Sequence, residues 1–273
     1  MKPDRIALWM GLAAALGFVL SLLVGPQGLG LPSGSEAARL VLTEIRLPRA
    51  ILGFLIGGAL GLAGAVLQGY LRNPLAEPGL MGVSGGAALG AVTVIHSGLA
   101  GVMPLALPLG GLAGGALATV TVMALAGELT GPLTLILAGV AVSSLAAALT
   151  SLALNLAPNP FAASEMLYWL MGSLTDRSLV HVWLASPLII AGSLVLASTG
   201  RALDALTLGE EAATNLGTNL KSLRRKIVAG TALAVGAATA VSGAIGFVGL
   251  VVPHLVRRFV GNEPGRLLLP SFL

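Results

Sequence analysis

Apolar residues run in long, nearly unbroken segments along this chain, and short polar connections separate them. A helix needs about 20 apolar residues to cross the roughly 30 Å hydrocarbon core of a bilayer, and these segments reach or approach that length. The pattern therefore predicts an all-α, polytopic membrane protein in which residues 1–273 form a single transmembrane domain. The predicted spans are 6–24, 50–69, 80–100, 105–127, 133–156, 180–199, 227–245 and, at half-length, 246–260.

Glycine recurs within these spans, often at every fourth position or in doublets. Such spacing lets helix backbones approach closely, which is how helices associate where lipid supplies no hydrophobic drive. No charged residue lies near the middle of a predicted span, which argues against a proton relay or an ion-coupled pump. The glycines predict tight helix packing at Gly53, Gly57, Gly61, Gly82, Gly86, Gly90, Gly110, Gly111, Gly114 and Gly115.

The composition excludes several other classes of protein. Hydrophobic residues make up 56% of the chain and charged residues 10%, whereas about a quarter of a typical soluble domain is charged. The mean hydropathy is +0.94. Because the chain has no cysteine, disulfides and thiolate chemistry are excluded. With 4% aromatic residues and no interleaving of aromatic with basic positions, no nucleic-acid partner is expected.

The basic residues predict the orientation. With a cytoplasmic N-terminus, four of the 15 Lys and Arg residues would lie outside, which leaves eleven inside, in accord with the positive-inside rule. Lys2 and Arg5 also precede segment 6–24 as they would precede a signal peptide. That segment exceeds the usual apolar region of about 7–15 residues, so we expect a retained first span. The four outer basic residues are Arg39, Arg46, Arg49 and Arg177.

One polar loop, residues 201–226, interrupts the apolar pattern and holds eight of the chain's 26 charged residues. Within it, Glu211, Ala212 and Ala213 are followed four residues later by Gly217. Acidic residues favour the start of a helix and glycine favours its end. The loop therefore predicts a short cytoplasmic helix that begins near Glu210 and stops at Gly217, suited to contact a soluble partner.

No catalytic or metal-binding pattern is present. The three histidines, His96, His181 and His254, lie near the ends of different spans, and zinc-protease, serine-hydrolase and phosphate-binding loop motifs are absent. We therefore expect neither enzymatic activity nor a metal or other cofactor in this chain. If the protein performs energised transport, another chain supplies the energy.

Several loop motifs are more specific than the spans. Two prolines four residues apart in 72–79 block a regular helix, and the three glycines and the proline of 243–254 predict a helix that is broken inside the membrane. The start of the third span, 82–86, is almost free of side-chain bulk. The motifs are RLPRA at 46–50, LQGYLRNPLAEPGLMGVSGGAALGA at 67–91, LAGVAVSSLAAAL at 137–149, YWLMGSL at 168–174, LGEEAATNLG at 208–217 and GAIGFVGLVVPHLVRR at 243–258.

Taken together and in this order, these motifs resemble the FecCD-type permeases, the membrane subunits of ABC importers for iron-siderophores, haem and cobalamin. The resemblance implies a type II ABC importer permease bundle in a bacterial or archaeal cytoplasmic membrane. It also implies the partners: two ABC ATPase subunits, a second permease copy or homologue, and an extracytoplasmic substrate-binding protein. The family typically has ten spans, so the resemblance leaves two C-terminal spans of the family without a counterpart in residues 1–273.

The resemblance assigns residue roles as well. The segment 208–217 corresponds to the family's coupling helices, which dock on the ATPase, although the Leu-Pro that should close the older E-A-A-x-x-x-G signature is replaced by Ala229 and Gly230. Its coupling residues are Leu208, Gly209, Glu210, Glu211, Ala212, Ala213, Leu216 and Gly217. Arg46 and Arg49 correspond to arginines that dock the binding protein. The residues implied for the translocation pathway or gate are Ser84, Gly85, Ser143, Ser144, Leu156, Ala157, Pro158 and Asn159.

One other function stays open at this stage. A secondary transporter with the same number of spans would work without an ATPase, and it would not depend on Glu211 or Gly217. The absence of charged residues near the middle of the predicted spans disfavours a secondary transporter. The sequence does not choose among siderophore, haem and cobalamin as the transported chelate.

Overall fold

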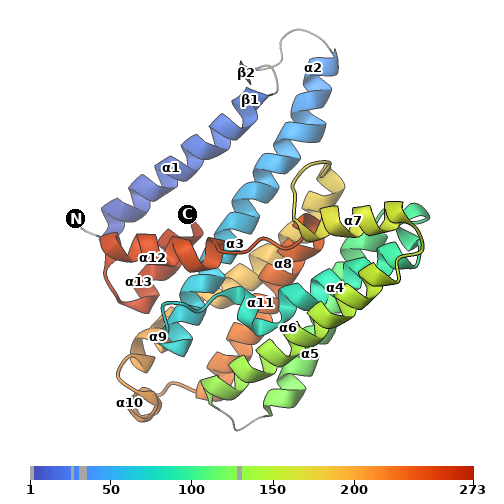
Figure 1. The fold of residues 1–273 in the computed structure, drawn as a ribbon. Helices are drawn as coiled ribbons and strands as arrows, with labels where there is room; N and C mark the ends of the chain where they lie inside the picture. Colours follow the sequence, from blue (N-terminus) through green and yellow to red (C-terminus); the bar gives the residue numbers. More distant parts are fainter. Residues whose placement is uncertain (1–2, 26–27, 31–35, 128–130) are drawn as a thin grey trace.

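The computed structural model describes residues 3–25, 28–30, 36–127 and 131–273 (Figure 1). Lys2, one of the basic residues used to predict the orientation, lies outside them. The first part of the chain forms α1 (Pro3–Leu23), β1 (Val24–Gly25), β2 (Gly28–Leu29), α2 (Glu36–Leu40), the π-helix η1 (Val41–Arg46), α3 (Leu47–Leu71), the 3-10 helix η2 (Pro78–Met81), α4 (Val83–His96), the 3-10 helix η3 (Leu99–Gly101) and α5 (Ala106–Ala126).

The second part is also helical. It forms α6 (Pro132–Asn155), α7 (Pro160–Leu170), α8 (Leu179–Ala197), α9 (Gly200–Leu206), α10 (Glu210–Asn215), α11 (Leu220–Ser242), α12 (Val248–Val260) and α13 (Pro264–Phe272). The strands β1 and β2 are two residues each and pair antiparallel between the first two long helices. The predicted all-α class is confirmed.

All eight predicted spans are helical, but fewer than eight helices qualify as membrane-crossing by length and apolarity. Among the described residues, five do so: Ile6–Leu23, Ala38–Leu71, Ala106–Ala126, Pro132–Asn155 and Leu179–Leu206. The predicted span 80–100 contains only the 14-residue α4, because the residues around it form 3-10 turns. The predicted spans 227–245 and 246–260 correspond to α11, whose first two turns are basic, and to the 13-residue α12.

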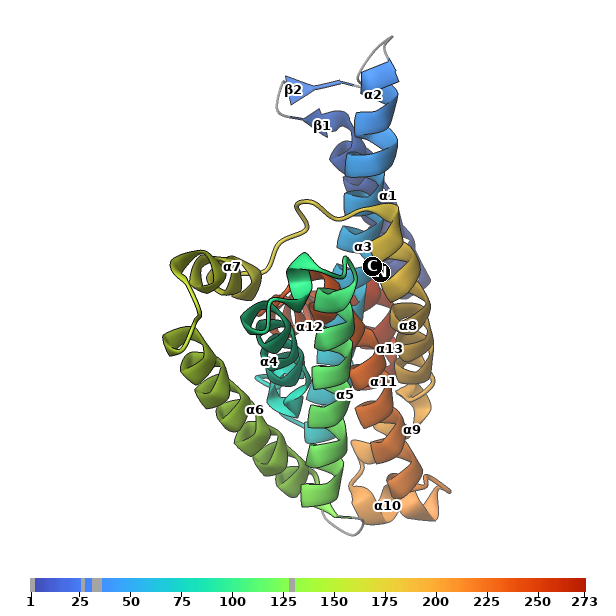
Figure 2. The same cartoon turned by 90° about the vertical axis from the view of Figure 1, so that its right-hand side faces the viewer.

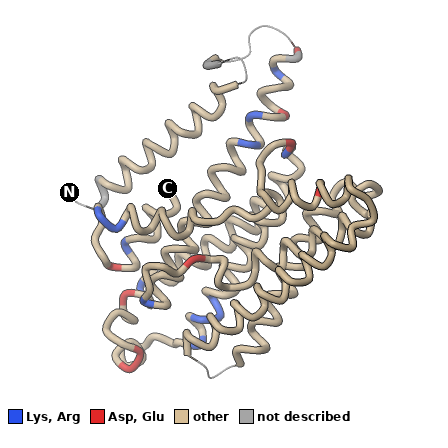
Figure 3. Tube along the Cα trace, viewed as in Figure 1, with Lys and Arg blue, Asp and Glu red and all other residues tan. Residues whose placement is uncertain are grey.

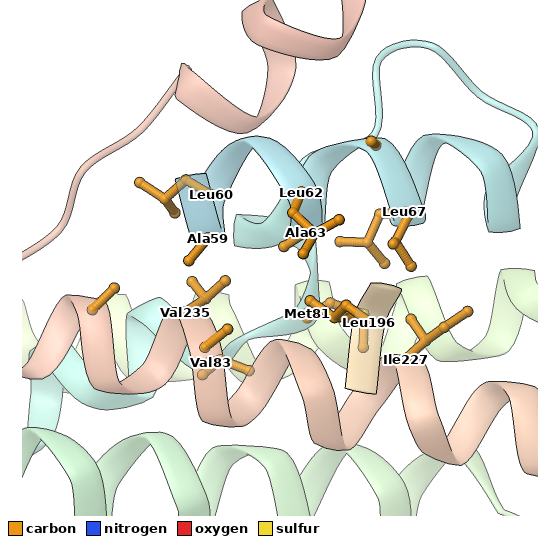
Figure 4. Packing of buried hydrophobic residues seen from close by; sticks show 14 of the residues in the cluster. Ala59, Leu60, Leu62, Ala63, Leu67, Met81, Val83, Leu196, Ile227 and Val235 are labelled. Atoms are coloured by element: carbon orange, nitrogen blue, oxygen red, sulfur yellow. The ribbon is translucent and has the colours of Figure 1, made fainter. Parts of the chain in front are cut away.

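The helix α3 occupies the centre of the bundle, and α1 lies at its edge (Figures 1 and 2). In the apolar stretch that contains α3, 72% of the residues are buried, compared with 6% in the stretch that contains α1. Figure 4 shows Ala59, Ala63 and Leu67 of α3 facing Val235 and Ile227 of α11. These side chains belong to one buried cluster, which also takes in Leu196, Met81 and Val83.

The predicted close packing at glycines is confirmed between α4 and α5. A Cβ atom added to Gly90 would lie 3.1 Å from the Cα of Gly114, and one added to Gly86 would lie 2.6 Å from the carbonyl oxygen of Gly114. Any larger residue at these positions would therefore push the two helices apart. This is the small-residue packing that membrane helices use in place of hydrophobic drive.

Candidate functional site: the coupling segment, the helix break and the pathway residues

The coupling segment, residues 208–217, folds as the predicted short helix. Gly209, with a φ of 101°, precedes α10, and Gly217, with a φ of 87°, follows it. The Thr218 N–H donates to the Ala213 carbonyl at 2.9 Å and the Gly217 N–H to the Thr214 carbonyl at 2.9 Å, which satisfies carbonyls at the helix end. A positive φ at both flanks explains why glycine stands at each end.

The segment presents an acidic and apolar surface on a fixed base. Leu208 and Leu216 are 67% and 66% exposed, whereas Ala213 is fully buried and α10 contacts α9. The carboxylates of Glu210 and Glu211 form no hydrogen bond or ion pair with any residue that the structure describes. Two exposed leucines beside two carboxylates can bind an apolar and basic groove on another protein.

The base of the coupling segment is packed into the membrane bundle. Between α8 and α9 the chain stays helical, and Leu203 and Leu206 of α9 are buried in the main core. On the other side, the Asn219 side chain accepts the Ser222 N–H at 2.9 Å and so caps α11. The chain on either side of α10 is thus anchored in the bundle, through α9 on one side and through α11 on the other.

The structure confirms the predicted helix break at 243–247. α11 ends at Ser242, Gly243 has a φ of 74° and α12 begins only at Val248. The Ser173 N–H donates to the Ser242 carbonyl at 2.6 Å, and a Cβ atom added to Gly172 would lie 2.7 Å from the Ala244 carbonyl oxygen. Two motifs about 70 positions apart, 168–174 and 243–254, therefore lie side by side, and the first satisfies backbone that the break frees.

A polar contact that sequence reasoning missed holds α12 to α3. The Gln68 Nε2 donates to the carbonyls of Gly249 and Leu250 at 3.4 and 3.3 Å. Its Oε1 accepts a hydrogen bond of 2.9 Å from Arg257 Nη2. Pro253 has no N–H for the carbonyl of Gly249, four residues earlier, so Gln68 fills this gap in the helix. The signal was available: Gln68 is a lone amide at the end of an apolar span.

Three of the implied pathway residues lie together where α4 begins beside α6. The Ser143 hydroxyl donates to the Gly79 carbonyl at 3.4 Å, and a Cβ atom added to Gly85 would lie 3.6 Å from the Ser143 Cα. The Ser84 hydroxyl accepts a hydrogen bond of 3.4 Å from Thr239 of α11. Ser144, the next residue on α6, is exposed instead. Two separate hydrogen bonds therefore hold this region together, one between α6 and η2 and one between α11 and the start of α4.

The other implied gate residues lie at the far end of α6. Leu156 is 63% exposed, and residues 157–159 form the bend before α7. The Asn159 side chain accepts the Ala162 N–H at 2.9 Å and caps α7, a helix that the sequence analysis did not predict. Two residues in the sequence indicate the start of this helix: Asn159 as the N-cap and Pro160 at the first helical position. The structure thus separates the implied pathway set into two groups at different depths.

The structure also distinguishes the two arginines of the RLPRA motif. Arg46 Nη1 donates to the carbonyls of Leu22 and Gly30 at 2.8 and 3.0 Å, so it ties the end of α1 to α3. Arg49 is exposed, and its guanidinium forms no hydrogen bond or ion pair within the described ranges. Of these two arginines, Arg49 is therefore the one whose guanidinium is available to bind a partner protein.

Arg49 and the coupling segment lie at opposite ends of the molecule. Figure 2 shows the start of α3 toward the top and α10 at the bottom, with the bundle between them. Acidic and basic residues are sparse along the bundle and gather near these two ends (Figure 3). The arrangement provides two separate charged surfaces on the two sides of an apolar body.

Known proteins have sequences related to this chain. A permease of Halobacterium salinarum named as a cobalamin import system protein is 40% identical over 247 residues, which are 90% of this chain and 65% of that protein. The vitamin B12 import system permease of Salmonella typhimurium is 37% identical over 269 residues, 98% of this chain and 81% of the relative. The chain thus spans just under two thirds of the first relative's length.

A solved structure extends the comparison to the fold. An ABC transporter described as of the metal-chelate type, in an inward-facing conformation, superposes with a TM-score of 0.89 at 30% identity, over 98% of this chain and 86% of that one. The FecCD transport family matches residues 12–273. From its motifs, its helix arrangement and this match over nearly its whole length, the chain belongs to the FecCD transport family.

Proposed function

We propose that this chain is the membrane-spanning permease subunit of an ABC importer that moves cobalamin or a related metal chelate. The observation that carries the proposal is the coupling segment, an exposed acidic and apolar helix on a buried base at one end of the bundle. The names of the relatives support the ligand class. The chain itself performs no chemistry in this proposal, since ATP hydrolysis belongs to a separate subunit.

The complex would contain two ATPases beneath two permeases, and a binding protein above them. The second permease is a copy of this chain or a homologue. The exposed leucines of α6 favour a membrane-embedded partner or lipid on that side, and Leu137, Leu145 and Leu152 are 59%, 59% and 53% exposed. We place the complex in a bacterial or archaeal cytoplasmic membrane with the N-terminus and α10 in the cytoplasm, as the distribution of Lys and Arg indicates.

The mechanism follows from the connections of α10. When the ATPases close on ATP, the grooves that hold the coupling segments move, and α9 and the start of α11 move with them. Because Thr239 of α11 donates to Ser84, this displacement would reach the start of α4, where Gly85 packs against Ser143 of α6. The pathway would thus switch between outward and inward access, a two-state equilibrium biased by nucleotide and by the binding protein.

Reconstitution with its ATPase and binding protein in liposomes tests this function against the secondary transporter. We expect uptake of cobalamin to require ATP and to survive collapse of the ion gradients by an ionophore. A catalytically dead ATPase should abolish uptake. Uptake that persists without ATP but stops with the ionophore would establish the secondary transporter instead.

The two arginines of the RLPRA motif predict different phenotypes. Arg49→Ala should weaken association with the binding protein up to about fivefold, because an exposed ion pair contributes about 0–1 kcal/mol, and the loss should shrink at high salt. Arg46→Ala should lower the melting temperature of the permease, because it removes the link between α1 and α3. Surface plasmon resonance and thermal melting measure the two effects. Equal losses of association in both variants would contradict the distinction.

A further inference from the structure

A groove between α8, α9 and α13 has no role in the proposed transport cycle. Its volume is about 750 Å³. It lies beside α9, the short helix that precedes the coupling segment (Figure 1). One wall of the groove is apolar. Some of its side chains are largely exposed, with Leu194 at 66% and Leu269 at 59%. The apolar lining residues are Leu62, Ile190, Leu194, Leu268, Leu269 and Phe272.

The mouth of this groove carries charges of both signs. The Arg266 Nε lies 2.6 Å from the Glu263 Oε2, and the Asp204 Oδ1 accepts the Gly265 N–H at 2.7 Å. Arg201 also lines the groove, and its guanidinium forms no hydrogen bond or ion pair with the residues that the structure describes. The four charged groups sum to zero, but one guanidinium is left without an internal partner.

A buried hydroxyl on the groove wall is a second, independent feature. Ser193 is 8% exposed and lines the groove, yet its Oγ has no hydrogen-bond partner in the described part of the chain. The neighbouring Ser198 differs, because its hydroxyl donates to the Val195 carbonyl at 2.7 Å. Leaving a buried hydroxyl without a partner is costly, so a ligand oxygen that accepts its hydrogen bond is favoured here.

We propose that this groove binds one phospholipid whose headgroup carries a primary amine, as ethanolamine does. Its phosphate binds Arg201, its ammonium group donates to Asp204 and Glu263, an ester carbonyl accepts from Ser193 and an acyl chain covers the apolar wall. An anionic headgroup without an amine would meet two carboxylates and bring no cation. A choline headgroup has no N–H donor for them. The mixed charge of the mouth therefore selects the zwitterionic amine.

Native mass spectrometry of the purified, delipidated permease tests the proposal. After titration with phosphatidylethanolamine, phosphatidylcholine or phosphatidylglycerol, we expect one phosphatidylethanolamine to be retained preferentially. Arg201→Gln should weaken this binding about tenfold, because it removes a charge-assisted hydrogen bond to the phosphate. Ala197→Trp places an indole at the exposed rim of the groove and should prevent retention, with the fold checked by thermal melting.

Matched controls separate the groove from the general lipid surface. Arg258→Gln removes another exposed arginine, and Val120→Trp adds an indole to an exposed position of α5. Both controls should retain the lipid as the unmodified chain does. Equal retention of the three lipids, stronger retention of phosphatidylglycerol, or undiminished binding by folded Ala197→Trp would each overturn the proposal. Because binding is measured without ATPase or substrate, the result is independent of the transport proposal.

Discussion

Leu216→Asp should uncouple the permease from its ATPase. Leu216 is exposed on the coupling segment, so the substitution leaves the bundle intact but puts a carboxylate where an apolar groove would receive the leucine. Central interface residues contribute about 2 kcal/mol or more, which corresponds to about a thirtyfold loss of affinity. Co-purification of the ATPase with the tagged permease, and ATP-driven uptake in liposomes, measure the effect.

The matched control is Leu99→Asp. Leu99 lies in η3, is 52% exposed and belongs to the end of the bundle away from α10. It should retain the ATPase fully. A second variant, Glu211→Arg, reverses a charge on the same segment and should weaken the complex in a salt-dependent way. If folded Leu216→Asp binds and drives the ATPase normally, the coupling segment does not have the proposed role.

Gln68→Leu should severely destabilise the permease. Leucine is similar in size, but it leaves the Gly249 carbonyl and the Arg257 guanidinium without their partner in the bundle. A buried polar group without a partner costs about 1–3 kcal/mol, and a charged one costs more, so the expected loss is about 3–5 kcal/mol. The melting temperature and the folded yield in detergent should both fall sharply.

Two further variants test this reason for the loss. Gln68→Glu keeps an acceptor for Arg257 and should be less harmful than Gln68→Leu. The double variant Gln68→Leu with Arg257→Met removes the unpaired charge and should recover part of the stability, because replacing both partners is less costly than replacing one. If both single variants melt as the unmodified chain does, the contact between α3 and α12 contributes little.

The positions of most helices could be predicted from the sequence because they depend on local patterns. The predicted spans 105–127 and 133–156 match α5 and α6 to within one residue at each end. The same holds for α10, since acidic residues and flanking glycines act within a few positions along the chain. The length of α4 was not predicted, because the hydropathy of 80–100 does not distinguish a helix from the 3-10 turns around it.

Within the candidate site, the sequence identified the motifs but not their contacts. It placed 168–174 and 243–254 in separate loops, whereas the structure joins them through Ser173 and Ser242. It treated Arg46 and Arg49 alike, and only the fold gives Arg46 the carbonyls of α1 as partners. Neither difference has a local signal, because each depends on a second segment far along the chain.

The sequence by itself determined that this protein is a helical membrane protein of the FecCD type, where its main helices lie, and that a short helix stands in its polar loop. The helix positions follow from hydropathy, glycine and proline, which act over one or two helical turns, and the family type follows from the resemblance of the loop motifs to that family. Only the tertiary structure decided that Gln68 closes the gap at Pro253, which arginine remains free and where a lipid-sized groove opens. Such features depend on the shapes and unpaired polar groups of packed helices, and these arise only when distant segments meet.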